Sequence, residues 1–429
     1  MLILSAALQQ LRAQLTRVNT SASGHHRLQV KFSSTEDTLT WLASQPCWPQ
    51  LWWQHRHGTE QVAACGAVAH FAQFSLAQQF SRRLPPDWRI WGCNNFSAEE
   101  SYLFLPRLIW RRCADAQWLI VNLYSENALY EDAQQALAFL DTLTSAALPA
   151  TLPTRLQHKQ HAPDKAAWCQ MVTQAIEGIQ AGAMEKVVLA RATDLHFEQK
   201  VSAAALLAQS RHVNLHCYHF MLAFDADTAF LGSSPERLYL RQHTELLTEA
   251  LAGTVARDSD ERTAVRQAEW LCNDDKNQRE NWLVVDDICQ RLHGMVSGLD
   301  VMPPEVVRLR KVQHLRRRIH AALRSHSDEL CLTRLQPTAA VAGLPRQAAR
   351  NFILRHEPFE REWYAGSMGY LSARQSEFCV SLRSARVDGA RVRLYAGAGI
   401  VAGSDPELEW QEIDNKAAAL ASLLTPEAL

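Results

Sequence analysis

The chain has 429 residues, of which 47% are hydrophobic and 21% are charged, values typical of a globular protein with a substantial core. Lysine and arginine total 44, aspartate and glutamate total 45, and the formal net charge is -1. This balance disfavours nucleic-acid binders and proteins that bind membranes by charge, because both usually carry a basic excess. The composition also excludes disorder along the whole chain.

The ten cysteines are scattered, and no two of them stand at Cys-x-x-Cys spacing. Such thiols are typical of reduced core residues in a cytosolic protein and argue against a disulfide framework or a zinc site. The N-terminal stretch lacks the basic start of a signal peptide and predicts an amphipathic helix. No window holds the roughly 20 apolar residues that span a bilayer. We therefore expect a cytoplasmic protein without membrane contact.

The region 1–148 is expected to mix short strands with helices. Periodicity predicts a helix over 131–145. The segment 149–164 contains Pro149, Pro153 and Pro163 with little periodicity, which indicates a linker before a second region, 165–429. Apolar and aromatic runs bounded by polar residues predict strands at 52–56, 61–71, 89–96, 103–113 and 118–124.

In the region 165–429, strands and helices follow one another in runs rather than in strict alternation. This order favours an α+β fold with largely antiparallel sheets. Helices are expected at 165–182, 202–211, 261–292, 346–355 and 406–424. Strands are expected at 186–197, within 217–253, and at 306–315, 363–371, 377–387 and 391–397.

The last predicted helix carries the most suggestive pattern. Glu409, Glu412 and Lys416 stand at i, i+3 and i+7, so they project from one helical face. The ordinary interpretation is a solvated face with an intrahelical ion pair. However, the helix follows a predicted strand that runs into a turn containing Gly397 and Gly399, whose backbone amides can approach an anion closely. Together these residues describe a candidate site for Mg²⁺ and an anionic ligand.

Other polar residues are less informative one by one. The polar stretch 273–281 indicates either an exposed turn of helix or a helix segment that faces a polar cavity. Lys186 opens an apolar strand, and Glu236 stands in a turn beside an arginine, so both have ordinary solvated interpretations. The basic run 308–318 is interleaved with apolar residues, as in a half-buried strand, which disfavours nucleic-acid binding.

Taken in order, eight segments resemble the chorismate-utilising enzymes, a family that includes anthranilate, aminodeoxychorismate, salicylate and isochorismate synthases. The resemblance covers 165–429, whereas 1–148 corresponds only in position to the variable N-terminal region of these proteins and is expected to pack on the same fold. It implies the fold of that family, with large, mainly antiparallel sheets packed as a sandwich and helices on the outside. The segments are 186–191 (KVVLAR), 232–238 (GSSPERL), 249–254 (EALAGT), 275–280 (DKNQRE), 312–314 (VQH), 336–338 (QPT) with 343–346 (GLPR), 381–385 (SLRSA) and 396–400 (AGAGI).

Within this family the chain is most similar to the isochorismate synthases of menaquinone biosynthesis. Ala252 stands where aminodeoxychorismate synthases have a nucleophilic lysine, and Lys186 is typical of members that use water instead of ammonia. Gln336 stands where siderophore-pathway isochorismate synthases commonly have histidine. The resemblance implies a monomeric isomerase that converts chorismate to isochorismate without a glutaminase subunit.

Three other functions remain open from the sequence. A salicylate synthase forms isochorismate and then removes pyruvate, and it shares the same motifs. An anthranilate or aminodeoxychorismate synthase component is disfavoured by Ala252 and Lys186. A non-catalytic protein that binds anions or nucleic acid is suggested only by the basic run 308–318.

The resemblance also implies roles for individual residues. Lys186 is expected to activate the water that adds at C2, and Glu236 to protonate the hydroxyl that leaves C4. The lysine must then be desolvated or lie near positive charge, and burial must keep the carboxyl protonated. Mg²⁺ is expected to hold the ring carboxylate through Glu280 and Glu412, with Glu409 as a direct or water-mediated third ligand.

The remaining expected site residues bind the substrate. Arg383 and Tyr364 are expected to hold the enolpyruvyl carboxylate, because a guanidinium can bind a carboxylate through two parallel hydrogen bonds. Lys416 and the glycine turn are expected to assist them. The turn comprises Gly397, Ala398 and Gly399, and the further pocket residues are Thr254, His314 and Thr338.

Overall fold

The computed structural model describes residues 3–114, 116–148, 150–153 and 155–425, in which the chain forms 11 helices and 20 strands. Every strand pairing is antiparallel, which confirms the predicted α+β fold. The elements before residue 164 are α1 (Leu4–Leu15), β1 (Gly24–Phe32), α2 (Thr38–Ala43), β2 (Gln50–Gln54), β3 (Glu60–Phe71), α3 (Phe74–Ser81), β4 (Ile90–Asn94), β5 (Ser101–Cys113), β6 (Ala116–Ser125), α4 (Leu129–Asp141) and β7 (Leu156–Ala162).

The rest of the chain adds seven helices and thirteen strands within the described residues. Two of them, β8 and α11, have the bounds that the sequence predicts. These elements are α5 (Lys165–Gln180), β8 (Lys186–Phe197), α6 (Ala203–Val213), β9 (Tyr218–Ala223), β10 (Thr228–Ser234), β11 (Arg237–Gln242), β12 (Glu245–Ala256), α7 (Glu261–Asn273), α8 (Asp275–Leu292), β13 (Val296–Val301), β14 (Glu305–Arg308), β15 (Val312–Leu323), α9 (Asp328–Leu335), β16 (Gly343–Leu344), α10 (Arg346–His356), β17 (Ser367–Leu371), β18 (Gln375–Val380), β19 (Ser384–Asp388), β20 (Arg391–Ile400) and α11 (Pro406–Leu424).

The strands form one continuously hydrogen-bonded sheet that folds back on itself. One arm follows the order β7, β8, β20, β19, β10, β9, β2, β3, and the other follows β15, β12, β11, β18, β17, β4. Strand β5 joins the arms because it pairs with both β3 and β4. Trp53 of β2 and Tyr370 of β17 lie on different arms, yet their ring centroids are 6.0 Å apart. The main apolar core therefore lies between the two arms.

Strands from the first 148 residues complete both arms of the sheet. Strand β2 pairs with β9, and β4 pairs with β17, so the regions before and after the expected linker share one sheet. That linker, 149–164, contains β7, which pairs with β8. Most side chains of β7 are exposed, so the strand lacks the apolar alternation on which the other strand predictions depend. Residues 149 and 154 of the expected linker lie outside the described chain.

Two further expectations near the functional region need correction. The helix predicted over 261–292 is interrupted, because Asp274 has an extended backbone and its carboxylate caps α8 by accepting the Asn277 N–H. The strand predicted over 377–387 is also two strands, and Arg383 lies between them with a φ of 47°. The elements that the sequence did not predict are β1, β7, β13, β16, α2, α3 and α9.

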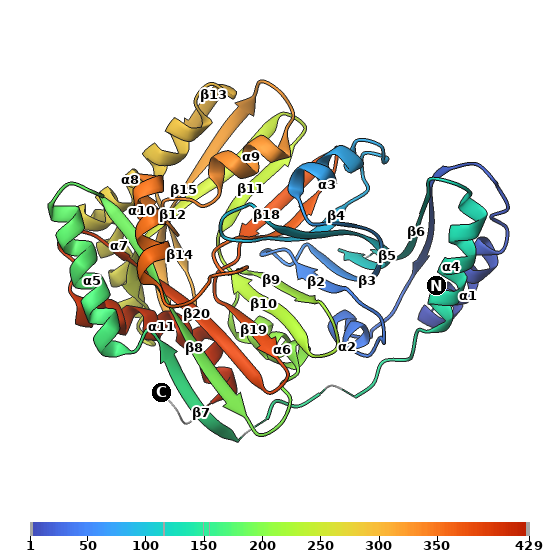
Figure 1. Ribbon diagram of the computed structural model, residues 1–429, viewed down its shortest axis with the longest axis horizontal. Helices are drawn as coiled ribbons and strands as arrows, with labels where there is room; N and C mark the ends of the chain where they lie inside the picture. The colour runs from blue at the N-terminus through green and yellow to red at the C-terminus, as the bar shows by residue number, and fades with distance from the viewer. Residues whose placement is uncertain (1–2, 115, 149, 154, 426–429) are drawn as a thin grey trace.

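Helices α8 and α11 cover the sheet at the end where β8 begins and β20 ends (Figure 1). Helix α8 packs on β12 and β15, while α11 packs on β20 and α5. At the opposite end of the molecule, α1 and α4 lie side by side against β1 and β6. Within the described residues, none of the helices combines the length and apolar character that a membrane crossing requires.

The start of β8 depends on a close approach by β16. Gly343 has a φ of +124°, and a Cβ there would lie 2.2 Å from the Lys186 carbonyl oxygen and 2.7 Å from the Val187 Cα. We predict that Gly343→Ala lowers the free energy of unfolding by about 2 kcal/mol or more, as measured by urea denaturation. Gly298→Ala in β13 is the control, because a Cβ there meets nothing within 4 Å. Equal losses in the two variants would contradict the prediction.

Candidate active site

A cavity of about 330 Å³ opens where β8, β12, β20, α8 and α11 converge. The structure places twelve of the fourteen residues expected from the sequence on its wall. The two exceptions are Ala398 and Thr338. The twelve are Lys186, Glu236, Thr254, Glu280, His314, Tyr364, Arg383, Gly397, Gly399, Glu409, Glu412 and Lys416.

The expected glycine turn is the last part of a strand. Gly397 and Gly399 pair with Ala190 and Val188 across the β20–β8 ladder, so the expectation of a turn at these residues is wrong. Side chains of a strand alternate between its faces, and Ala398 consequently points into the apolar core, where it is fully buried. Thr338 is also buried, and its carbonyl oxygen accepts the N–H groups of two residues that follow it.

The two glycines leave space for side chains that reach the cavity. A Cβ at Gly397 would lie 2.8 Å from the Tyr364 hydroxyl oxygen, and one at Gly399 would lie 3.0 Å from the Lys186 Cε. The Tyr364 ring stacks on Tyr395, with centroids 5.0 Å apart and an interplanar angle of 7°. Burial raises the pKa of Tyr364 to about 12, so its hydroxyl is neutral and can donate a hydrogen bond.

Lys186 and Glu280 form an ion pair inside the cavity. Lys186 is the first residue of β8, its side chain is 2% exposed, and its Nζ donates to Glu280 Oε1 over 3.0 Å. Burial alone would raise the pKa of Glu280, but the charge and the hydrogen bond of Lys186 lower it below its ordinary value. Glu280 is therefore a carboxylate at neutral pH.

Glu236 is a buried carboxyl, and one of its two oxygens has no hydrogen-bonding partner among the described residues. It lies between β10 and β11 and is 2% exposed, and its Oε1 accepts no hydrogen bond from the described residues. The neighbouring arginine does not pair with it, because Arg237 binds Glu377 instead. Burial, reinforced by the negative charge of Glu249, raises the pKa of Glu236 to about 8. This carboxyl is therefore protonated at neutral pH.

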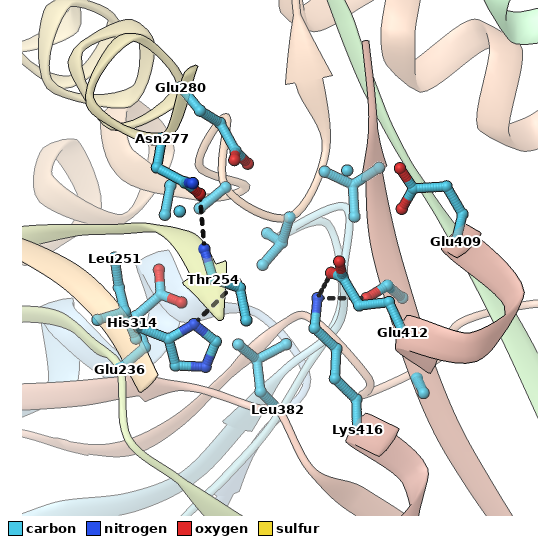
Figure 2. A pocket seen from close by; sticks show the side chains of 18 of the residues that line it. Glu236, Leu251, Thr254, Asn277, Glu280, His314, Leu382, Glu409, Glu412 and Lys416 are labelled. Atoms are coloured by element: carbon cyan, nitrogen blue, oxygen red, sulfur yellow. Dashed lines mark hydrogen bonds and ion pairs between the residues drawn. The ribbon is translucent and has the colours of Figure 1, made fainter. Parts of the chain in front are cut away.

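Three glutamates face a common space from opposite sides of the cavity. Figure 2 shows Glu280 on one side, with Glu409 and Glu412 of α11 on the other. Burial and the charge of Glu412 raise the pKa of Glu409 to about 7. Glu412 accepts from Lys416 Nζ over 2.7 Å, and the same Nζ donates to the Gly397 carbonyl oxygen. Among the described residues, no three acidic, His or Cys side chains form a preassembled metal site.

A hydrogen-bonded chain orients Arg383 and Thr254. Arg383 Nη2 donates to His314 Nε2 over 3.1 Å, so the His314 proton resides on Nδ1, which lies 3.0 Å from Thr254 Oγ1. Burial, together with the positive charges of Arg383 and Lys416, holds the pKa of His314 well below its ordinary value. The imidazole is thus neutral, and the Thr254 hydroxyl hydrogen is available to a ligand.

The sequence did not single out several other cavity residues. Asn277 Oδ1 accepts the Thr254 N–H over 3.0 Å, and Figure 2 shows Asn277 on the same helix as Glu280. Their i, i+3 spacing within the polar stretch 273–281 is a signal that could have identified it. The apolar lining residues, by contrast, have no distinctive local pattern. They include Val188, Leu251, Val341 and Leu382, together with the exposed Trp270.

Comparisons with known proteins agree with this geometry. The family model of chorismate binding enzymes matches residues 93–425. The chain is 55% identical to the isochorismate synthase MenF of Escherichia coli (strain K12) over 99% of both chains. It is 40% identical to the isochorismate synthase MenF of Haemophilus influenzae (strain ATCC 51907 / DSM 11121 / KW20 / Rd), over 99% of this chain and 97% of that one.

A solved structure shares the whole architecture. The structure described as MenF, the menaquinone-specific isochorismate synthase from Escherichia coli, superposes with a TM-score of 0.96 at 55% identity, covering 98% of this chain and 100% of that chain. The family match begins at residue 93, which lies within the region 1–148 that precedes the expected linker. The protein is a member of the chorismate-binding enzyme family.

Proposed function

We propose that the protein is an isochorismate synthase, an isomerase that converts chorismate to isochorismate for menaquinone biosynthesis. The observation that carries this proposal is the presence, in one cavity, of a buried amine, Lys186, and a buried, protonated carboxyl, Glu236. Moving a hydroxyl group between two ring carbons requires such a base and such an acid. The 55% identity to an Escherichia coli isochorismate synthase over nearly the whole chain supports the same activity.

The reaction places two opposite demands on the cavity. Water must lose a proton as it adds at C2 of the ring, and the hydroxyl that leaves C4 must gain one. Glu236 supplies the second proton, because its neutral carboxyl at neutral pH is the form that can donate. Lys186 is the ammonium of an ion pair with Glu280 in this structure, so it must first release that proton to solvent. The resulting neutral amine can then accept the proton of the water that adds at C2. In the reverse direction the two residues exchange these roles.

Cationic and neutral donors in the cavity fit the two carboxylates of chorismate. Arg383 forms no ion pair with a carboxylate in the described part of the chain and so can bind one from the substrate. Tyr364 and Thr254 add neutral hydroxyl donors on the same wall. We assign the enolpyruvyl carboxylate to Arg383 and Tyr364, with Lys416 nearby.

The donor set of the cavity fits Mg²⁺. Glu280, Glu409 and Glu412 offer the hard oxygen ligands that this ion prefers. Burial beside the negative charge of Glu412 raises the pKa of Glu409, and a cation between α8 and α11 would favour its ionised form. When bound, Mg²⁺ would neutralise the ring carboxylate and hold it in place. We assign Glu280 and Glu412 as ligands and Glu409 as a direct or water-mediated third.

Water, rather than ammonia, is the proposed nucleophile. Ala252 lines the cavity and has no group that could attack the substrate covalently. We therefore infer that the protein works without a glutaminase subunit, and we further propose that it is a monomer. All ten cysteines are free thiols, which suits a reducing compartment, so we place the enzyme in the cytoplasm.

Incubation of the protein with chorismate and Mg²⁺ is expected to yield isochorismate, identified by chromatography and mass spectrometry. Because Ala252 stands where aminodeoxychorismate synthases have a nucleophilic lysine, we expect no covalent adduct and no nitrogen uptake from labelled ammonium. Stoichiometric release of pyruvate would instead identify a salicylate synthase. Formation of anthranilate or aminodeoxychorismate would assign the protein to the ammonia-using branch.

Loss of either proton-transfer group should stop turnover in both directions. We predict that Lys186→Ala and Glu236→Gln each lower kcat by about 10²–10⁴-fold, the usual contribution of general acid–base catalysis. In the wild type, kcat/KM should fall as the pH rises through about 8, since Glu236 then loses the proton that it must donate. Steady-state kinetics with Glu198→Gln, an exposed carboxylate on the surface, as the control would check this. Near-normal turnover by a folded Lys186→Ala protein would refute the assignment.

Removal of a proposed metal ligand should raise the Mg²⁺ requirement. We predict that Glu412→Gln loses most activity at low Mg²⁺ and binds Mg²⁺ at least tenfold more weakly, as measured by calorimetry. Glu407→Gln is the matched control on the same helix, because Glu407 pairs with Lys165 on the surface. Full wild-type activity in EDTA would contradict the metal assignment.

A further inference from the structure

The segment that carries Glu236 is held by an arginine from the opposite half of the sequence. Arg56 lies between β2 and β3, and its Nη1 donates to the Pro235 carbonyl oxygen over 3.0 Å. The same guanidinium makes a bidentate pair with Glu249 of β12, with Nη1–Oε1 at 2.6 Å and Nη2–Oε2 at 2.9 Å. Glu249 Oε1 also accepts the Arg237 N–H over 2.8 Å. The pair is thus hydrogen-bonded to the backbone of Pro235, which precedes Glu236, and to that of Arg237, which follows it.

The Arg56–Glu249 pair is almost completely removed from water. The two side chains are 4% and 1% exposed. A bidentate guanidinium–carboxylate pair in such surroundings has a fixed geometry, because moving either partner leaves a buried charge uncompensated. The backbone groups bonded to it, at Pro235 and Arg237, are fixed with it.

We propose that Arg56 and Glu249 are positioning residues for Glu236, which hold the segment 235–237 so that the Glu236 carboxyl projects into the cavity. The inference rests on the proposed role of Glu236 as the proton donor. It also gives the first part of the chain a defined task, since Arg56 precedes the expected linker by about ninety residues. It likewise gives Glu249, a buried carboxylate of β12, a role in the site.

The Arg56–Glu249 pair also affects the pKa of Glu236 through its charges. Burial alone would raise the pKa of Glu249, but the charge and hydrogen bonds of Arg56 lower it, so Glu249 is ionised. Its negative charge is, after burial, the largest cause of the raised pKa of Glu236. The positive charges of Lys186, Arg56 and Lys416 act in the opposite direction. Besides burial, the pKa of Glu236 responds to the charges of Glu249 on β12, Lys186 on β8, Arg56 after β2 and Lys416 on α11. The other titratable residues that line the same cavity are Asp274, Lys276, Glu280, His314, Tyr364, Arg383, Tyr395, Glu409 and Glu412.

The decisive variant is Glu249→Gln, which keeps the shape of the side chain and one acceptor oxygen but removes the charge. The positive charge of Arg56 is then no longer offset by the negative charge of Glu249, so the pKa of Glu236 should fall. We expect the alkaline limb of the kcat/KM profile to move to lower pH by about one unit, the effect of one nearby charge. An unchanged limb in folded Glu249→Gln protein would overturn the proposal.

Asp132→Asn is a closely matched control. Asp132 makes a bidentate pair with Arg107, which also donates to the Asn122 carbonyl oxygen, and Asp132 accepts the Tyr124 N–H. The pair is similarly buried, with side chains 8% and 9% exposed, but it does not line the cavity. Asp132→Asn should reduce thermal stability to a similar extent and leave the pH profile unchanged. A shift of the same size in this variant would show that the effect is general destabilisation and would overturn the proposal.

Arg56→Lys separates geometry from charge. Lysine keeps the positive charge but cannot bind both Glu249 oxygens and the Pro235 carbonyl together. We expect kcat to fall about tenfold or more, with KM within about twofold of the wild type and the alkaline limb at its original pH. This variant also tests the proposal if Glu249→Gln does not fold. Wild-type kcat in Arg56→Lys would contradict the positioning role.

A spectroscopic titration distinguishes failure of this inference from failure of the proposed function. The infrared band of the protonated Glu236 carboxyl can be assigned by its loss in Glu236→Gln and followed with pH in the wild type and in Glu249→Gln. A titration at lower pH in Glu249→Gln supports the proposal whether or not chorismate is converted. Coincident titrations would refute it even if isochorismate is formed.

Discussion

The ladder between β8 and β20 is the interaction on which the site depends. Ten residues of β20 pair with ten of β8, from Arg391 opposite His196 to Ile400 opposite Val187. This register places Lys186, the first residue of β8, beside the glycines at the end of β20. Because antiparallel strands run in opposite directions, the start of one and the end of the other meet at the same edge of the sheet. The helix that follows β20 then brings Glu409, Glu412 and Lys416 over that edge.

Burial acts on Glu236, Glu249 and Glu377, but their charge states differ with their partners. Glu377 accepts from Arg237 and Tyr218 and lies near His55, and these contacts hold its pKa at about 2 despite burial. Glu249 is likewise ionised through Arg56. Glu236 has no cation bonded to it, so burial prevails and it keeps its proton. The same residue type is therefore a buried anion at Glu249 and Glu377 and a neutral carboxyl at Glu236.

The first part of the chain is inseparable from the site in structural terms. Strands β2 and β3 end one arm of the sheet and β4 ends the other, where β5 joins the two arms. Trp53 and Trp91 belong to the core that supports β9 and β17. Arg56 extends this support to the backbone around Glu236. A region without a recognisable motif can therefore support the site. Arg56 does so through its position in the fold, and no sequence motif around it indicates this contact.

The sequence by itself determined the family, the order of the motifs, the bounds of β8 and α11, and the common face of Glu409, Glu412 and Lys416. These features follow from local rules, because helix and strand periodicity is a property of neighbouring residues. Only the tertiary structure showed that Gly397 and Gly399 belong to a strand, that Ala398 and Thr338 lie off the cavity, and that Asn277 lies on it. It alone paired Arg237 with Glu377 and left Glu236 unpaired. The pairing of strands and the burial of charges depend on which distant segments meet, and no local pattern carries that information.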